Sequence, residues 1–237
     1  MKLKVKFAGT CVGIVLSYLT LLIYPNPLFD NVYKYRSFTI YSDRHISDNI
    51  EFVIDDVIIR VEQSELFHPS DTYKLYLCND NWWFNLFSRN GNAGGAVNFV
   101  ISGNIFIREN DIVSNQIIPP ESWVFPLEDR PLSYFIAHET VHSLQRDQNR
   151  LLVLKAPVEI VEGYADYIAK GKVADKSSLI ANFKNRSPRM NPTNGLYDQY
   201  HVYVFYLIDQ KRFSIERIID EQPDLHMTLL EMRKNIQ

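Results

Sequence analysis

The sequence predicts an α+β fold in which a small, strand-rich half precedes a helical half. Short β-branched and aromatic segments, typical of strands, dominate residues 37–109, whereas apolar residues at helical spacing dominate the chain after residue 129. A proline-rich connection lies between the two halves. Because a run of strands is followed by a run of helices, the order favours α+β. A chain of 237 residues is long enough for one substantial core.

Local patterns place the elements of each half. The strand-rich half is expected to contain a strand at 37–41, a helix that begins at Ser47, a strand at 72–78, a short helix or loop at 79–90, and two strands within 94–109 joined by a turn at Ser102-Gly103-Asn104. The helical half is expected to contain a helix that begins at Asp129-Arg130-Pro131, a helix from Pro157 to Gly171, a helix over residues 196–210, and two short helices.

Residues 1–24 predict one transmembrane helix. Three lysines precede the apolar run Phe7–Tyr24, whose length of about 18 residues just reaches the roughly 20 needed to cross a bilayer. The following Tyr24-Pro25-Asn26-Pro27 is a poor cleavage site, which favours an uncleaved anchor over a removed signal peptide. The lysines indicate a single-pass cell-membrane protein whose remaining chain lies outside the cytoplasm, in the periplasm if the source is bacterial. Residues 25–37 then form a linker.

Composition excludes one class of partner and one kind of covalent support. The net charge is -3 and the basic residues are scattered, so we expect no nucleic-acid partner. Of the two cysteines, Cys11 lies in the N-terminal apolar run and Cys78 is alone in the rest of the chain. No disulfide is therefore expected within the domain, which must be held by its core and any bound metal.

His138-Glu139-Thr140-Val141-His142 is an H-E-x-x-H pattern in the first predicted helix of the helical half. Residues four apart share a helix face, so both imidazoles can bind one zinc ion. Glu139 can reach the open coordination position and take a proton from bound water. The competing interpretation is two helix histidines that are four residues apart by coincidence.

Carboxylates on the next predicted helix can complete a ligand set, since catalytic zinc usually has three protein ligands. The metzincin pattern is absent, because Gln145 and Gln148 stand where it requires Gly and His. Glu162 offers a carboxylate ligand, with Glu159 as a rival. Asp166, one turn after Glu162 on the same face, can accept the outer N–H of a ligand histidine and fix its orientation.

Together, the pattern at 138–142 and the following Glu162-Gly163-Tyr164-Ala165-Asp166-Tyr167 resemble the gluzincin zinc metallopeptidases, in particular the small peptidase-MA-like proteins with a thermolysin- or aminopeptidase-N-like core. The resemblance implies a zincin-like catalytic domain over residues 38–237. It also implies that His138, His142 and Glu162 bind Zn²⁺, with Asp166 as the partner of a ligand histidine.

The segment from Tyr197 to Leu207 resembles the helix that follows the site in aminopeptidase-N-like gluzincins. The resemblance implies that the Tyr197 hydroxyl stabilises the oxyanion formed when water attacks the peptide carbonyl. The match departs at Tyr200, where the family usually has Gly, so Tyr200 and His201 stay open as alternatives. Packing of an aromatic core helix is the competing explanation.

Gly94-Gly95-Ala96-Val97-Asn98 lies where such enzymes carry the edge strand that pairs with the substrate backbone. The resemblance implies that Gly95, Ala96 and Val97 bind substrate. Aminopeptidases place a Glu in this strand to hold the free amine of the substrate. Val97 is the nearest position here, which favours an endopeptidase. A glycine bend or bulge without a binding role is the alternative.

These features predict a membrane-anchored zinc peptidase that cleaves a protein or peptide substrate with a zinc-activated water. Two other functions stay open, a non-catalytic zinc-binding module for assembly or sensing and a zinc hydrolase of another amide or ester. Glu139 argues against the first, because retention of the metal does not need it. The second would use the same activated water. Oligomeric state is not encoded in any of these motifs.

Overall fold

The computed structural model describes residues 2–88, 94–119, 127, 129–148, 156–171 and 175–235. Its helices are α1 (Lys2–Ile23), α2 (Ile50–Val61), α3 (Asn81–Ser88), α4 (Leu132–Gln148), α6 (Val158–Lys170), α7 (Lys176–Lys184), α8 (Asp198–Phe205), α9 (Ile215–Glu221) and α10 (Leu225–Asn235), with short 3-10 turns at Asn26–Leu28, Pro188–Met190 and Pro192–Asn194 and a π-helical turn at Tyr206–Gln210. Its strands are β1 (Asn31–Tyr35), β2 (Phe38–Ser42), β3 (Tyr73–Leu77), β4 (Ala96–Phe99), β5 (Asn104–Ile107), β6 (Asn110–Asp111) and β7 (Gln116–Ile117).

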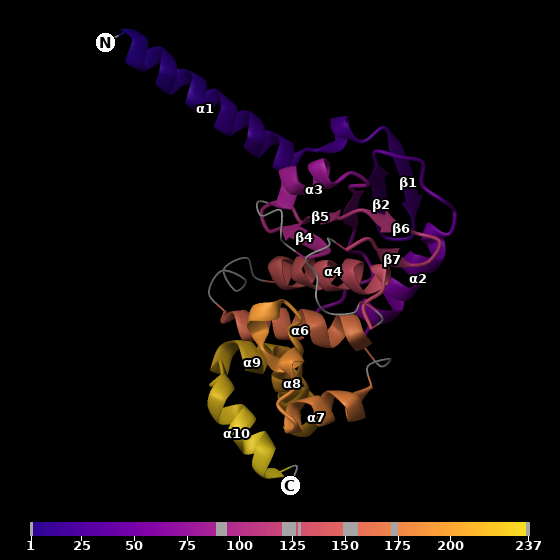
Figure 1. Ribbon diagram of the computed structural model, residues 1–237, viewed down its shortest axis with the longest axis vertical. Coiled ribbons are helices and arrows are strands. Elements are labelled where there is room, and N and C mark those ends of the chain that lie inside the picture. The colour runs from indigo at the N-terminus through magenta and orange to yellow at the C-terminus, as the bar shows by residue number, and fades with distance from the viewer. Residues whose placement is uncertain are drawn as a thin grey trace.

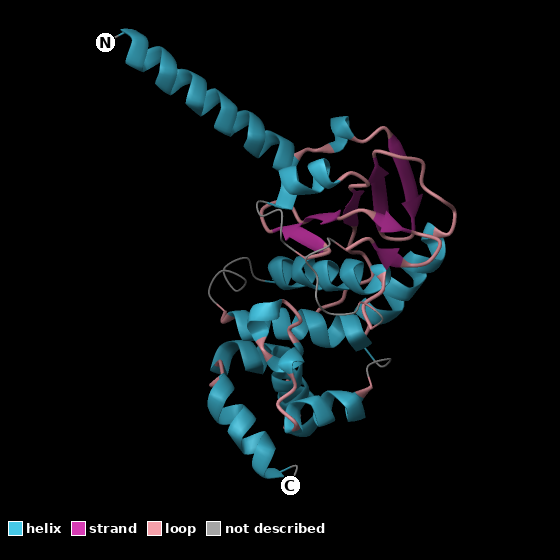
Figure 2. Ribbon diagram, viewed as in Figure 1, coloured by secondary structure: helices cyan, strands magenta, loops and turns pink. Residues whose placement is uncertain are grey.

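The α+β class is confirmed, because the strands gather at one end of the molecule and helices α6 to α10 at the other (Figure 2). Five strands form one mixed sheet in the order β1-β2-β3-β5-β4. The inner strands β2, β3 and β5 are parallel, and the outer strands β1 and β4 are antiparallel to their neighbours. Helix α4 lies between the sheet and α6, so it connects the two halves (Figure 1).

The two faces of the sheet contribute to two separate apolar clusters. Leu75 and Leu77 of β3 point into the larger cluster, which α2, α4, α6 and α8 complete. Tyr76 points the opposite way, into a smaller cluster with Phe84 and Phe87 of α3. This alternation follows from the two-residue repeat of a strand. Helix α4 therefore packs on the face of the sheet that carries Leu75 and Leu77.

The N-terminal helix corrects the prediction for residues 1–24. Within the part of the chain that the structure describes, no helix is both long enough and apolar enough to cross a membrane. This finding overturns the predicted transmembrane helix, the membrane as a partner, and the single-pass membrane location with a domain outside the cytoplasm. The physical reason lies at the end of the helix, because α1 ends at Ile23 and its last turn packs on the folded domain, where Leu22 is buried and not available to lipid.

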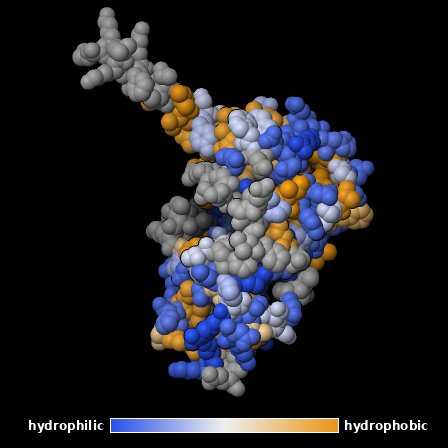
Figure 3. All heavy atoms as spheres, viewed as in Figure 1, coloured by the Kyte–Doolittle hydropathy of each residue, from blue (hydrophilic) through white to orange (hydrophobic). Residues whose placement is uncertain are grey.

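The last turns of α1 belong to the folded domain. Leu22 is 1% exposed and lies in the smaller apolar cluster. The side-chain amide of Asn104 donates to the carbonyl oxygens of Leu22 and Ile23 at 3.0 and 3.1 Å, and the Tyr18 hydroxyl donates to Leu86 O at 2.8 Å. Beyond these contacts the described part of α1 exposes apolar side chains to solvent (Figure 3).

Several local predictions are confirmed and others miss elements. The strands expected at 37–41 and 72–78 are β2 and β3, and the segment 79–90 contains the helix α3, with residues 89 and 90 outside the described part. The expected linker at 25–37 instead contains a 3-10 turn and β1, which pairs with β2 along its whole length. Helix α7 is a further element without a predicted counterpart.

Candidate metal centre

Helix α4 carries both histidines of the H-E-x-x-H pattern. It begins directly after Pro131, as the sequence predicts, and its first backbone N–H groups are satisfied by Asn115. The N–H of Leu132 donates to Asn115 O at 2.8 Å, and that of Ser133 donates to Asn115 Oδ1 at 3.0 Å. These bonds satisfy donors that a helix start otherwise leaves unpaired, so the start of the metal-site helix is fixed to the loop that follows β6.

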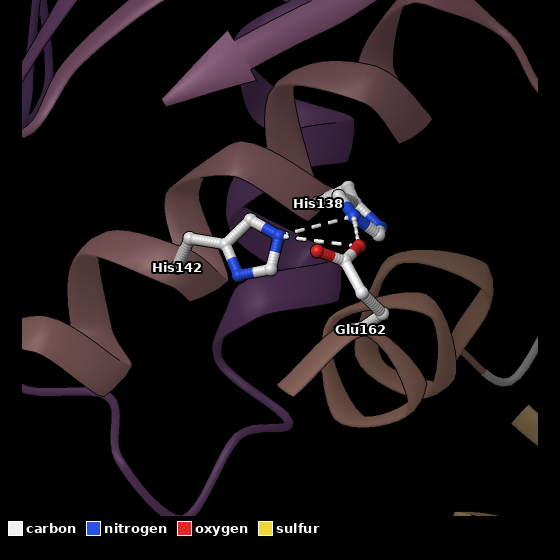
Figure 4. A group of neighbouring side chains, drawn as sticks. All are labelled: His138, His142 and Glu162. Carbon is white, nitrogen blue, oxygen red and sulfur yellow. Dashed lines mark hydrogen bonds and ion pairs between the residues drawn. The ribbon is translucent and has the colours of Figure 1, made fainter. Parts of the chain in front are cut away.

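The three predicted ligands come together between α4 and α6 (Figure 4). The Nε2 atoms of His138 and His142 lie 3.2 Å apart, and Glu162 Oε2 lies 3.2 Å from the first and 3.6 Å from the second. One potential ligand atom from each residue lies within 4.8 Å of the others. Among the described residues this group includes Glu162 and not its rival Glu159.

The donor set and its charge fit a divalent cation. Two imidazole nitrogens and one carboxylate oxygen are typical ligands of zinc. Burial by itself would lower the pKa of His142, but the carboxylate of Glu162 raises it to about 9. The centre therefore stabilises positive charge, and His138, His142 and Glu162 could hold a metal ion.

Glu139 is buried beside this group, with only 8% of its surface exposed. Burial raises the pKa of its carboxyl above the ordinary value, and the nearby His142 and His138 oppose that rise. A carboxylate with a raised pKa is a better proton acceptor near neutral pH. Strand β4 holds this turn of α4 in place, because the Asn98 side-chain amide donates to Glu139 O at 2.8 Å and to Ser143 Oγ at 2.7 Å.

Asp166 is fully buried, but among the described residues no hydrogen bond joins it to His138 or His142, the partner that the sequence predicts. It accepts from the Tyr134 hydroxyl at 2.5 Å and from His201 Nδ1 at 2.9 Å, and it pairs with Lys170 Nζ at 2.9 Å. Burial would raise the pKa of Asp166, but the Lys170 ammonium and the hydrogen bond from His201 hold it well below its usual range. Asp166 therefore joins α4, α6 and α8 through its hydrogen bonds and ion pair.

Tyr197 is the one of the three oxyanion candidates whose ring packs against a ligand. Its ring stacks on that of His138, with centroids 5.8 Å apart, and it also stacks on the ring of Tyr200. Burial and the charges of Glu162 and Glu139 raise the pKa of the Tyr197 hydroxyl. His201 is 2% exposed, and its Nδ1 is already paired with Asp166.

The backbone of Tyr197 is in the left-handed region, with φ at 56°. This conformation is uncommon for a residue with a side chain and costs of order 1–3 kcal/mol. It lies immediately before α8 and turns the chain so that the ring faces His138. A strained residue next to converging ligands is a common feature of functional sites.

The three residues expected to bind substrate lie at or beside β4, the edge strand of the described sheet. A Cβ on Gly95 would lie 2.4 Å from Ile117 Cδ1 and 2.8 Å from Phe135 Cε1, so close packing requires a glycine there. Ala96 packs against the larger apolar cluster and Val97 against the smaller one. Any contact of these residues with a substrate would therefore be made by the backbone.

Gly163 permits the close contact of α6 with α8. A Cβ at this position would lie 2.6 Å from Tyr200 O and 2.8 Å from Val204 Cγ2. The first of these atoms belongs to the backbone and cannot rotate away. The glycine that follows Glu162 in the motif therefore sets the distance at which α8, and with it Tyr197, approaches the ligands.

We expect Gly163→Ala to lower the free energy of unfolding by about 1–3 kcal/mol, because the added methyl group overpacks the contact between the two helices. Chemical denaturation of the full chain measures the change. Gly13→Ala is the matched control, since a Cβ at that helical position meets nothing within 4 Å. An unchanged stability in the Gly163 variant would show that α6 and α8 do not pack this closely.

Sequence reasoning missed the contacts of Gln145, which entered only as a departure from the metzincin pattern. Its side chain lies between His142 and the backbone of α6. Its position three residues after the second histidine was the available signal, since such residues share a helix face.

Comparison with known protein families finds none that matches the chain, and comparison with curated proteins finds no relative.

Proposed function

We propose that this protein is a zinc-dependent peptidase with a zincin-like catalytic domain. The observation that carries the proposal is the convergence of His138 Nε2, His142 Nε2 and Glu162 Oε2 from two helices, with the buried Glu139 beside them. Two imidazoles and one carboxylate leave a fourth position of a tetrahedral site open, which distinguishes catalytic from structural zinc sites. Zinc in such a site supplies a Lewis acid that polarises a carbonyl and lowers the pKa of water.

In this proposal, side chains of the protein carry out proton transfer and stabilise the oxyanion. Glu139 accepts the proton of the attacking water, and its raised pKa suits it to pass that proton to the leaving amine. Tyr197, whose hydroxyl stays protonated because its pKa is raised, donates a hydrogen bond to the developing oxyanion. Both residues are held by neighbouring elements, Glu139 by the contact of Asn98 with α4 and Tyr197 by stacking on His138.

The substrate in this proposal is an extended peptide that pairs with β4, the edge strand of the described sheet. Strand addition uses backbone hydrogen bonds, and Asn98 brings this edge next to the turn of α4 that carries Glu139. Val97 supplies no charge to hold a free amine and packs into the smaller cluster. An endopeptidase is therefore favoured over an aminopeptidase.

Zinc content of the full-length chain, purified without a metal-binding tag, tests the ligand set. We expect about one zinc per chain in the wild type and a large loss in Glu162→Ala, because a catalytic site depends on three protein ligands. Glu159→Ala is the matched control, since Glu159 lies one turn earlier on the same helix and outside the ligand group. A wild-type chain that neither contains nor takes up zinc would refute the proposal.

A further inference from the structure

Gln145 joins a ligand histidine to the helix that carries the third ligand. Its Oε1 lies 2.9 Å from His142 Nδ1, and its Nε2 donates to Val161 O at 3.0 Å. Val161 directly precedes Glu162 on α6. The Gln145 residue is 3% exposed, so water does not substitute for these partners.

The orientation of the Gln145 amide follows from its second partner. A backbone carbonyl can only accept a hydrogen bond, so the group that faces Val161 O must be the NH₂ of the amide. The amide oxygen therefore faces His142, and an oxygen without hydrogen can only accept. His142 Nδ1 must then carry a proton and donate it.

A histidine that keeps its proton on Nδ1 offers its lone pair on Nε2. In this structure Nε2 is the atom of His142 that points at His138 and Glu162. His138 is different, because its buried Nδ1 has no hydrogen-bond partner among the described residues. The described contacts thus orient one of the two ligand imidazoles.

We propose that Gln145 is a positioning residue that fixes the His142 tautomer in which Nε2 is the metal-binding atom. The inference rests on the proposed zinc site. An outer hydrogen-bond partner of this kind holds the ring in place and strengthens its nitrogen as a ligand. Here the partner is an amide whose own orientation is set by the backbone of α6, so the tautomer and the spacing of the two ligand helices are fixed by the same side chain.

The test is zinc affinity of the full chain, measured by competition with a chromophoric chelator. We expect Gln145→Met to weaken zinc binding about 10–100-fold, because methionine fills a similar volume and its thioether sulfur is only a weak hydrogen-bond acceptor. Gln145→Glu keeps an acceptor for His142 Nδ1 and gives up the bond to Val161, and we expect it to bind zinc at least as tightly as the wild type. Thermal unfolding of the zinc-free variants separates an effect on folding from an effect on the ligand.

The results of this experiment distinguish a failure of the proposed zinc site from a failure of the proposed role of Gln145. If the wild type binds no zinc, both the proposed function and the role of Gln145 in metal binding are refuted. If the wild type binds zinc and Gln145→Met binds it equally well, the positioning role alone is refuted. Equal weakening in Gln145→Met and Gln145→Glu also refutes it, since the bond to Val161 would then account for the loss.

Discussion

Glu139→Gln is expected to retain zinc and lose peptidase activity by about 10²–10⁴-fold, the usual contribution of a positioned acid-base group. The substitution keeps the size of the side chain and removes its ability to accept a proton. Glu139 is not one of the three converging ligands, so the metal should remain.

Cleavage of an unfolded protein substrate by the full chain, monitored together with zinc content, measures this effect. Glu159→Gln is the matched control, because it removes one carboxylate from the neighbouring helix outside the ligand group. Retention of full activity in Glu139→Gln would rule out its role as proton acceptor. A wild-type chain that binds zinc and cleaves no peptide, but does cleave a non-peptide amide or an ester, would favour a zinc hydrolase of another amide or ester. No activity on any of them would favour a non-catalytic zinc module.

The positions of the ligand helices could be predicted because their signals are local. Pro131 and Pro157 directly precede the first residues of α4 and α6, and proline is compatible with a helix start. The spacing of His138 and His142 places both rings on one face of α4. Glu162 joins them because α6 packs directly against α4, where the Gln145 side chain binds the backbone of Val161.

The supporting contacts could not be predicted because their partners are distant in the sequence. Asp166 was expected to bind a ligand histidine, yet its partners are Tyr134 and His201 from two other helices and Lys170 one turn later on its own. Gln145 depends on a carbonyl of α6, and no side-chain pattern encodes a backbone partner. The packing of the helices determines these hydrogen-bond partners, and a sequence pattern within one segment does not specify that packing.

The N-terminal prediction failed for a similar reason. Hydropathy alone describes the run Phe7–Tyr24 without indicating where its helix ends or what covers it. The helix ends at Ile23, and Leu22 is buried against the smaller apolar cluster by contacts with residues far along the chain. The same limit applies to β1, whose pairing with β2 turns an expected linker into an edge strand.

Asp166→Ala is expected to lower the free energy of unfolding by about 3–5 kcal/mol, as is usual when one partner of a buried ion pair is removed. The variant leaves the Lys170 ammonium, the Tyr134 hydroxyl and His201 Nδ1 without their common acceptor in a fully buried site. Asp198, which binds Lys170 at 2.5 Å, offsets only part of this loss because Arg189 already occupies its other oxygen.

Chemical denaturation at pH 7 measures this loss. The folded-state pKa of Asp166 lies below its usual value, so the stability that its carboxylate contributes is fully present above the unfolded pKa of about 3.9 and declines only as the pH falls below it. Asp55→Ala is the control, because Asp55 pairs with Arg36 at an exposed site and should cost at most about 1 kcal/mol. Asp166→Asn, which keeps the shape and loses the charge, should also destabilise the fold. Equal effects of the Asp166 and Asp55 substitutions would mean that the buried network does not hold α4, α6 and α8 together.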